Sequence, residues 1–86
     1  MKQFTYVIED KNGIHARPAG LLAKKAAEYS SKITLIKDNK RADTRRIMML
    51  MALGIKCGDQ IDIVVEGEDE DVAVSEIKKF LNENRY

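Results

Sequence analysis

The stretch Asn12–Gly20 constrains this chain most, because it joins a strand pattern to a helix pattern. Before it, Phe4, Tyr6 and Ile8 alternate with Thr5 and Val7, as in a half-buried strand. After it, Leu21–Tyr29 has the pattern of a helix. Pro18, the only proline, supports the boundary, because proline fits the first turn of a helix, where its missing N–H costs nothing. The only histidine, His15, is therefore expected where a strand gives way to a helix N-terminus.

The remaining elements follow from the same kinds of pattern. Alternation predicts further strands at Lys32–Lys37 and Gln60–Val65, and a hairpin turn at Asp38–Lys40 predicts a short edge strand at about Lys40–Asp43. Helical spacing and end signals predict helices at about Ala16–Glu28, Ile47–Leu53 and Glu70–Asn82. The order strand–helix–strand–strand–helix–strand–helix implies an α+β domain. Its antiparallel, four-stranded sheet would have one face covered by helices and the other open to solvent.

The first helix is expected to turn Leu21, Leu22 and Ala26 inward and to leave Lys24 in solvent. Alanines and Gly20 keep this helix thin near its start. Either the sheet or a partner protein could therefore approach Gly20 closely, and the sequence leaves both readings open.

The second helix is short and rich in methionine, with Met48, Met49 and Met51. A helix of this length cannot bury all three on one face, so at least one, Met48 or Met51, is expected to be exposed. Exposed methionines make an adaptable contact surface. The alternative, that they fill an irregular core, stays open from the sequence. Gly54 is expected to end the helix.

Two polar stretches are expected to cap helices. Asp43 or Thr44 precedes the second helix and could cap it. The acidic run Glu66–Asp71 leads into the third helix, where negative charge stabilises the helix dipole. The run lacks the twelve-residue ligand pattern of a calcium loop, so capping is favoured over metal binding.

Length and charge exclude several classes of protein. A chain of 86 residues forms one domain, 1–86. A net charge of +1 argues against a general nucleic-acid binder. A single cysteine suits a reducing compartment, and no apolar run approaches the ~20 residues of a membrane span. A cytoplasmic protein without membrane insertion is expected.

The chemistry of the His15 junction points to phosphate. A helix start leaves backbone N–H groups unpaired and carries partial positive charge, which favours an anion. Here those N–H groups belong to Ala16 and Arg17, and the Arg17 guanidinium can add a charged contact. The same field disfavours a protonated imidazole, so His15 keeps a lone pair for attack on phosphorus. The residues predict a site that carries a phosphoryl group on histidine.

Two other readings of His15 compete with this one. On residue types alone, His15 could equally be a polar cap of the helix. A metal site is disfavoured, because such sites usually need three or four ligands and the chain has no second histidine.

Two blocks of the sequence resemble one known family. Gly13–Ala19 resembles the active-site signature of the HPr family, the histidine-containing phosphocarriers of the bacterial sugar phosphotransferase system. Arg45–Ile55 resembles that family's second helix and regulatory region. The blocks stand at the family's spacing, and the likeness runs from Met1 to the last helix. It implies an open-faced β-sandwich with strand order 1-4-2-3 and three helices on one face.

The resemblance also implies a role for the site. His15 would accept a phosphoryl group on Nδ1 from enzyme I, ultimately from phosphoenolpyruvate, and pass it to sugar-transporter IIA components. Ala16 and Arg17 would hold the phosphate. The protein would be a phosphohistidine carrier that catalyses no reaction by itself. It would need no cofactor or metal and would be a monomer. Enzyme I and the IIA components would dock on a surface formed by Gly20, Lys24, Ile47, Met48 and Met51.

One position departs from the family. Many relatives from Gram-positive bacteria have a regulatory serine just before the second helix, where this chain has Arg46. Arginine has no hydroxyl to accept a phosphoryl group in place of that serine, so regulation at this position is not expected.

Two other functions remain as alternatives to a sugar phosphocarrier. One is an HPr-like regulatory protein that acts by docking, and the other is a carrier of the nitrogen-related branch of the phosphotransferase system.

Overall fold

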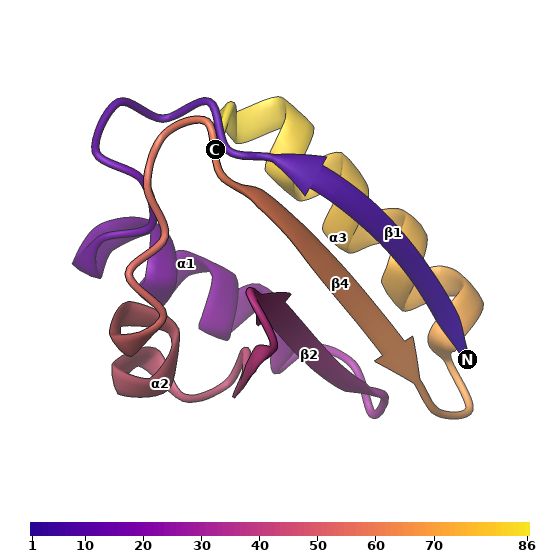
Figure 1. The fold of residues 1–86 in the computed structure, drawn as a ribbon. Helices are drawn as coiled ribbons and strands as arrows, with labels where there is room; N and C mark the ends of the chain where they lie inside the picture. The colour runs from indigo at the N-terminus through magenta and orange to yellow at the C-terminus, as the bar shows by residue number, and fades with distance from the viewer.

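A computed structural model describes all residues, 1–86. Four strands form one antiparallel sheet in the order β1-β4-β2-β3, with β1 Lys2–Val7, β2 Lys32–Lys37, β3 Lys40–Asp43 and β4 Gln60–Glu66. The helices are α1 Ala16–Ala26, α2 Ile47–Ala52 and α3 Glu70–Asn84. Figure 1 shows α3 running along β1 and β4, with α1 and α2 toward the β2–β3 end of the sheet. The predicted fold class and strand order are confirmed.

The core lies between one face of the sheet and the helices. On the central strand β4, Ile61, Ile63 and Val65 are almost completely buried and alternate with more exposed residues. Ile63 pairs with Phe4 of β1 on one side and with Leu35 of β2 on the other, so apolar side chains meet across three strands. This period of two is what a sheet with one covered face requires.

The helices contribute small and aliphatic side chains to the same core. From α1 and α3 the fully buried ones are Ala19, Leu22, Ala26, Ala73, Ile77 and Leu81. The alanines allow close packing, because they bring the helix backbone near its neighbours.

Details of the first helix differ from the prediction. Leu21 is 38% exposed and does not face the core, so its predicted placement is wrong. The helix ends at Ala26, before the predicted Glu28. Hydrogen bonds from Glu28 N–H to Lys25 O and from Tyr29 N–H to Ala26 O tighten its last turn.

The second helix has no side-chain cap. Its N-cap position is Arg46, and neither predicted residue caps it. Thr44 is buried and donates its hydroxyl to Ile33 O at 2.9 Å, whereas Asp43 accepts the Arg45 N–H at 3.0 Å in the preceding turn. Gly54 follows the C-cap Leu53 with φ +65°, as the predicted helix end requires.

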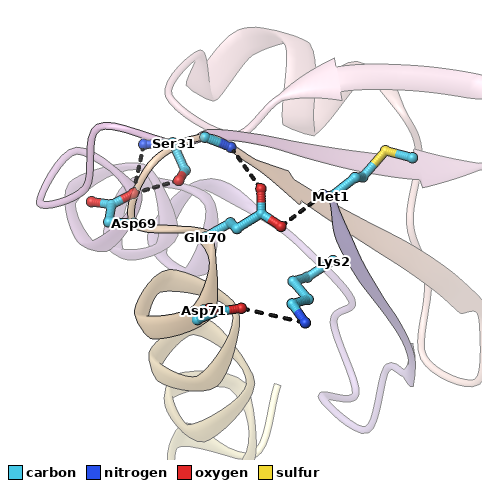
Figure 2. A network of polar contacts seen from close by, with 7 residues as sticks. Met1, Lys2, Ser31, Asp69, Glu70 and Asp71 are labelled. Carbon is cyan, nitrogen blue, oxygen red and sulfur yellow. Dashed lines mark hydrogen bonds and ion pairs between the residues drawn. The ribbon is translucent and has the colours of Figure 1, made fainter.

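Asp69, from the acidic run, joins the start of α3 to the start of β2. Its carboxylate accepts the N–H groups of Ser30 and Ser31, both at 2.9 Å, and the Ser31 hydroxyl (Figure 2). The hydroxyl of Ser31, followed by these N–H groups, lowers the pKa of Asp69. Asp69 occupies the N-cap position of α3 but makes no side-chain capping hydrogen bond, so it does not cap the helix. Glu70 and Asp71 lie in the first turn, where their negative charge stabilises the helix dipole as predicted.

The next two acidic residues bind other partners. Glu70 pairs with the amino group of Met1 at 2.6 Å and accepts the Gly67 N–H at 3.2 Å, and these contacts, the amino group first, lower its pKa. Asp71 pairs with Lys2 at 3.4 Å. Figure 2 shows these carboxylates directed at separate partners rather than toward one point, so they do not form a metal cage.

No helix is both long and apolar enough to cross a membrane.

Candidate functional site

The loop before α1 is fixed by close contact with the loop after α2. Gly13 has φ +66°, and a Cβ added there would lie 2.1 Å from Ile55 O. The next residue, Ile14, is buried and donates its N–H to the same carbonyl at 3.1 Å. Only glycine fits such a close approach at positive φ. The backbone immediately before His15 therefore has a defined position.

The loop after α2 is in turn held by Lys37 at the end of β2. The Lys37 Nζ pairs with the Asp59 carboxylate at 2.7 Å and donates to Gly54 O at 3.0 Å. Asp59 also accepts the Lys56 N–H at 2.7 Å. The Lys37 contact, followed by the Lys56 N–H, lowers the pKa of Asp59.

His15 occupies the N-cap position of α1 in extended conformation, with φ −101° and ψ −169°. Its side chain makes no capping hydrogen bond and is 42% exposed. The alternative that the His15 side chain caps the helix is therefore wrong. The imidazole is open to solvent at the start of α1.

The start of α1 offers the predicted anion-binding groups. The first intrahelical hydrogen bond runs from Ala19 N–H to His15 O at 3.0 Å, so the N–H groups of Ala16 and Arg17 precede the hydrogen-bonded part of the helix. Pro18 is buried in the first turn and has no N–H to satisfy. The Arg17 side chain is exposed and makes no ion pair or hydrogen bond within the protein.

His15 and Arg17 line one open pocket of about 410 Å³. Its other lining residues come from the loop before α1, the first turn and the end of the chain: Asp10, Asn12, Pro18, Asn84 and Tyr86. The sequence analysis missed four of these: Asp10, Asn12, Asn84 and Tyr86. The Asn12-Gly13 turn is a local signal that could have suggested the first pair. No local sequence pattern indicates that Asn84 or Tyr86 lines the pocket, because both lie far from His15 in the sequence.

Asp10 is the acidic side chain of this pocket. One carboxylate oxygen, Oδ1, accepts the Asn12 N–H at 2.9 Å, and the other, Oδ2, lies 4.0 Å from His15 Nε2. The Asp10 N–H donates to Tyr86 O at 3.1 Å, which ties this loop to the end of the chain. One histidine and one carboxylate are too few to hold a metal ion.

A group of exposed apolar side chains lies on α1 and α2. They are Leu21, Ile47, Met48, Met49 and Met51, with exposed fractions of 38, 40, 78, 40 and 40%. Gly20 faces Ile47, because a Cβ added to Gly20 would lie 4.0 Å from Ile47 Cδ1. We call these five side chains with Gly20 the α1–α2 patch. The prediction that Met48 or Met51 is exposed is confirmed, and Met49 is exposed as well.

The basic residues near the α1–α2 patch have different roles. Lys24 is exposed on α1, as predicted. Lys25 instead pairs with Glu28 at 3.5 Å and lies over the Tyr29 ring. Arg45 donates to the carbonyls of Tyr29 and Ser31 and so fixes the turn after α1. Lys25 and Arg45 are therefore engaged within the protein.

Comparisons with known proteins agree with this fold. The family described as "PTS HPr component phosphorylation site" matches residues 2–83. The chain is 46% identical to phosphocarrier protein HPr of Mycoplasma capricolum, over 94% of this chain and 91% of that protein. A solved histidine-containing phosphocarrier protein of a mycoplasma superposes with a TM-score of 0.93 at 42% identity, covering 98% and 96% of the two chains. The crystal structure of HPr from Thermoanaerobacter tengcongensis superposes with a TM-score of 0.90 at 38% identity, covering 95% of this chain and 92% of that chain. The chain belongs to the HPr family, the phosphocarrier proteins of the bacterial phosphotransferase system.

Proposed function

We propose that His15 is the residue on which this protein carries a phosphoryl group between enzyme I and a sugar-transporter IIA component. The observation that carries the proposal is an imidazole, 42% exposed, at the start of α1 beside an unpaired Arg17. Nε2 lies on the side of Asp10, so Nδ1 is the nitrogen available for attack on phosphorus. The new N–P bond forms as the donor's bond to phosphorus breaks, and the donor leaves with the electron pair of that bond.

The surrounding groups suit a transient carrier. The N–H groups of Ala16 and Arg17 and the Arg17 guanidinium can neutralise the charge on the transferred group. In-line phosphoryl transfer depends chiefly on such positioning and charge stabilisation. The pocket is open to water, which weakens each contact and allows the group to leave again.

The α1–α2 patch and Lys24 form the docking surface in this proposal. The patch is apolar and methionine-rich, so it can adapt to partners of different shape, as a carrier with several partners needs. Because Gly20 has no side chain, a partner can approach the helix backbone closely there, although Gly20 itself adds little contact area. Lys24 adds a positive charge that steers acidic partners and raises the association rate.

The phosphorylation assay tests this function. The protein is incubated with labelled phosphoenolpyruvate and enzyme I, and an acid-labile, base-stable phosphate is expected. His15→Ala should abolish the label while circular dichroism shows the wild-type fold. A label that persists in His15→Ala, or no label on wild-type protein, would contradict the proposal.

The remaining parts of the proposal concern the molecule as a whole. Residues 1–86 act as one phosphocarrier domain, a monomer in the cytoplasm that needs no cofactor. Regulation by phosphorylation of a serine just before α2 is not expected, because this position is Arg46, which lacks the serine hydroxyl. Light scattering at working concentration checks the monomer, and a mass near twice 9.8 kDa would contradict it.

A further inference from the structure

We propose that Asp10 is a positioning residue that holds a proton on His15 Nε2 and thereby keeps the lone pair on Nδ1. The observation is the Asp10 Oδ2 atom, 4.0 Å from Nε2. The inference rests on the proposed phosphoryl-carrier role of His15. It adds a residue that sets which ring nitrogen is the nucleophile.

The Asp10 carboxylate is held in place before any ligand arrives. Its Oδ1 accepts the Asn12 N–H at 2.9 Å, and its carbonyl accepts the Gly13 N–H at 2.9 Å. Its own N–H donates to Tyr86 O. With Oδ1 and the backbone engaged, Oδ2 is the oxygen that faces His15.

A carboxylate in this position selects one imidazole tautomer. Ionised aspartate is an acceptor only, and a neutral imidazole has one N–H donor and one acceptor nitrogen. The pair is favourable when the proton is on Nε2, because the carboxylate 4.0 Å away then faces an N–H donor rather than a lone pair. Hydrogen bonds to one ring nitrogen commonly set the state of the other.

The same placement serves both directions of transfer. When Nδ1 attacks phosphorus, Nε2 keeps its proton and the ring gains positive charge, which the Asp10 carboxylate offsets. When the group leaves, the electron pair of the N–P bond returns to Nδ1. The proton on Nε2 does not move in either step.

No other acidic side chain lines the pocket. The other charged side chain there is Arg17, which has no acceptor for Nε2–H. The Asn84 amide donates to Phe80 O at 2.8 Å and is engaged within α3. Among the ionisable side chains of the pocket, Asp10 is the one paired with His15, so it is the residue to change.

Asp10→Asn is the decisive variant. The Asn12 N–H donates to Oδ1 in the wild-type protein, so the amide oxygen is expected at that position, which leaves the amide NH₂ facing Nε2. This donor should shift the His15 ring toward the Nδ1–H tautomer, read from ¹⁵N ring shifts of the unphosphorylated protein. With enzyme I, kcat for phosphoryl transfer to the carrier should fall about tenfold, with KM nearly unchanged.

Two further variants control the experiment. Asp10→Glu keeps an acceptor and should restore the Nε2–H tautomer and part of the rate. Glu9→Gln makes the same charge change at the exposed neighbouring residue and should alter neither readout. Thermal unfolding of each variant confirms that the fold is retained.

Each outcome decides the inference. A wild-type tautomer in Asp10→Asn overturns it, whether or not the rate falls. A wild-type rate despite a shifted tautomer also overturns it. Because the tautomer is measured without phosphate, it separates failure of this inference from failure of His15 as the acceptor, which the His15→Ala assay reports.

Discussion

At the scale of single residues, the site depends on how closely two loops approach. Gly13 has φ +66° and contacts the Ile55 carbonyl so tightly that no side chain fits. Gly54 has nearly the same φ, +65°, but no atom lies within 4 Å of the position that a Cβ would take. Comparing alanine substitutions at the two glycines therefore separates the free-energy cost of backbone strain from that of a steric clash.

Gly13→Ala should lower the free energy of unfolding by about 3 kcal/mol or more, because it adds a steric clash to backbone strain. Gly54→Ala, the matched control, should lose only about 1 kcal/mol. Denaturant unfolding measures both, and equal losses would contradict the close-approach argument.

At this scale, the sequence could predict the site residues that are neighbours along the chain but not those that only the fold brings to the pocket. His15, Ala16 and Arg17 were predictable, because they are adjacent and one local rule, the helix N-terminus, explains all three. Tyr86 was not, because it reaches the pocket through the docking of the chain end onto the loop before α1. Such contacts leave no periodic signal.

At the scale of elements, strands were easier to predict than helix ends. The bounds of β2 and β3 agree with the prediction, because alternation and the turn between them fix both ends. The helix ends depended on caps, and the caps were misassigned. Asp43, Thr44 and Asp69 use their side chains for other contacts that only the tertiary structure creates.

The uncapped second helix leads to a stability prediction. Arg46 has extended geometry, with φ −109° and ψ 99°, suited to a capping side chain, but arginine has no acceptor and places positive charge at the dipole-positive end. Arg46→Asp should raise the free energy of unfolding by about 1 kcal/mol. Arg46→Ala should gain less, since it removes the charge without adding a cap. Chemical denaturation checks both, and equal gains would show that charge alone acts.

At the scale of the whole molecule, polar contacts tie distant segments together. Asp69 joins the start of α3 to the turn before β2, and Glu70 joins α3 to the start of β1 (Figure 2). Both carboxylates have a lowered pKa in the folded protein. They stabilise the fold where they are ionised, above the pKa of the unfolded chain.

The lowered pKa of Asp69 leads to a prediction about stability at low pH. The contribution of Asp69 is fully present above about pH 4, the ordinary range for aspartate, and is lost as the pH falls through its lower folded-state pKa. Asp69→Asn should therefore be less stable than wild type at pH 6, and the difference should vanish near pH 2. Thermal melts across this range test it. A difference that stays constant with pH would assign the loss to the changed hydrogen bonds with Ser31 instead of to charge.

The final prediction concerns how one face serves several partners. Met48 is 78% exposed in the α1–α2 patch, whereas Val72 is 59% exposed on α3, outside that patch. Truncating either should change stability by less than about 0.5 kcal/mol, because neither is packed in the core. A contact central to an interface costs more than about 1 kcal/mol when truncated, so Met48→Ala should raise KM for transfer from enzyme I about fivefold or more, with kcat nearly unchanged. Val72→Ala should leave KM unaltered. Equal KM values for the two variants would place the docking surface elsewhere, since exposure and apolar character alone would then fail to distinguish α2 from α3.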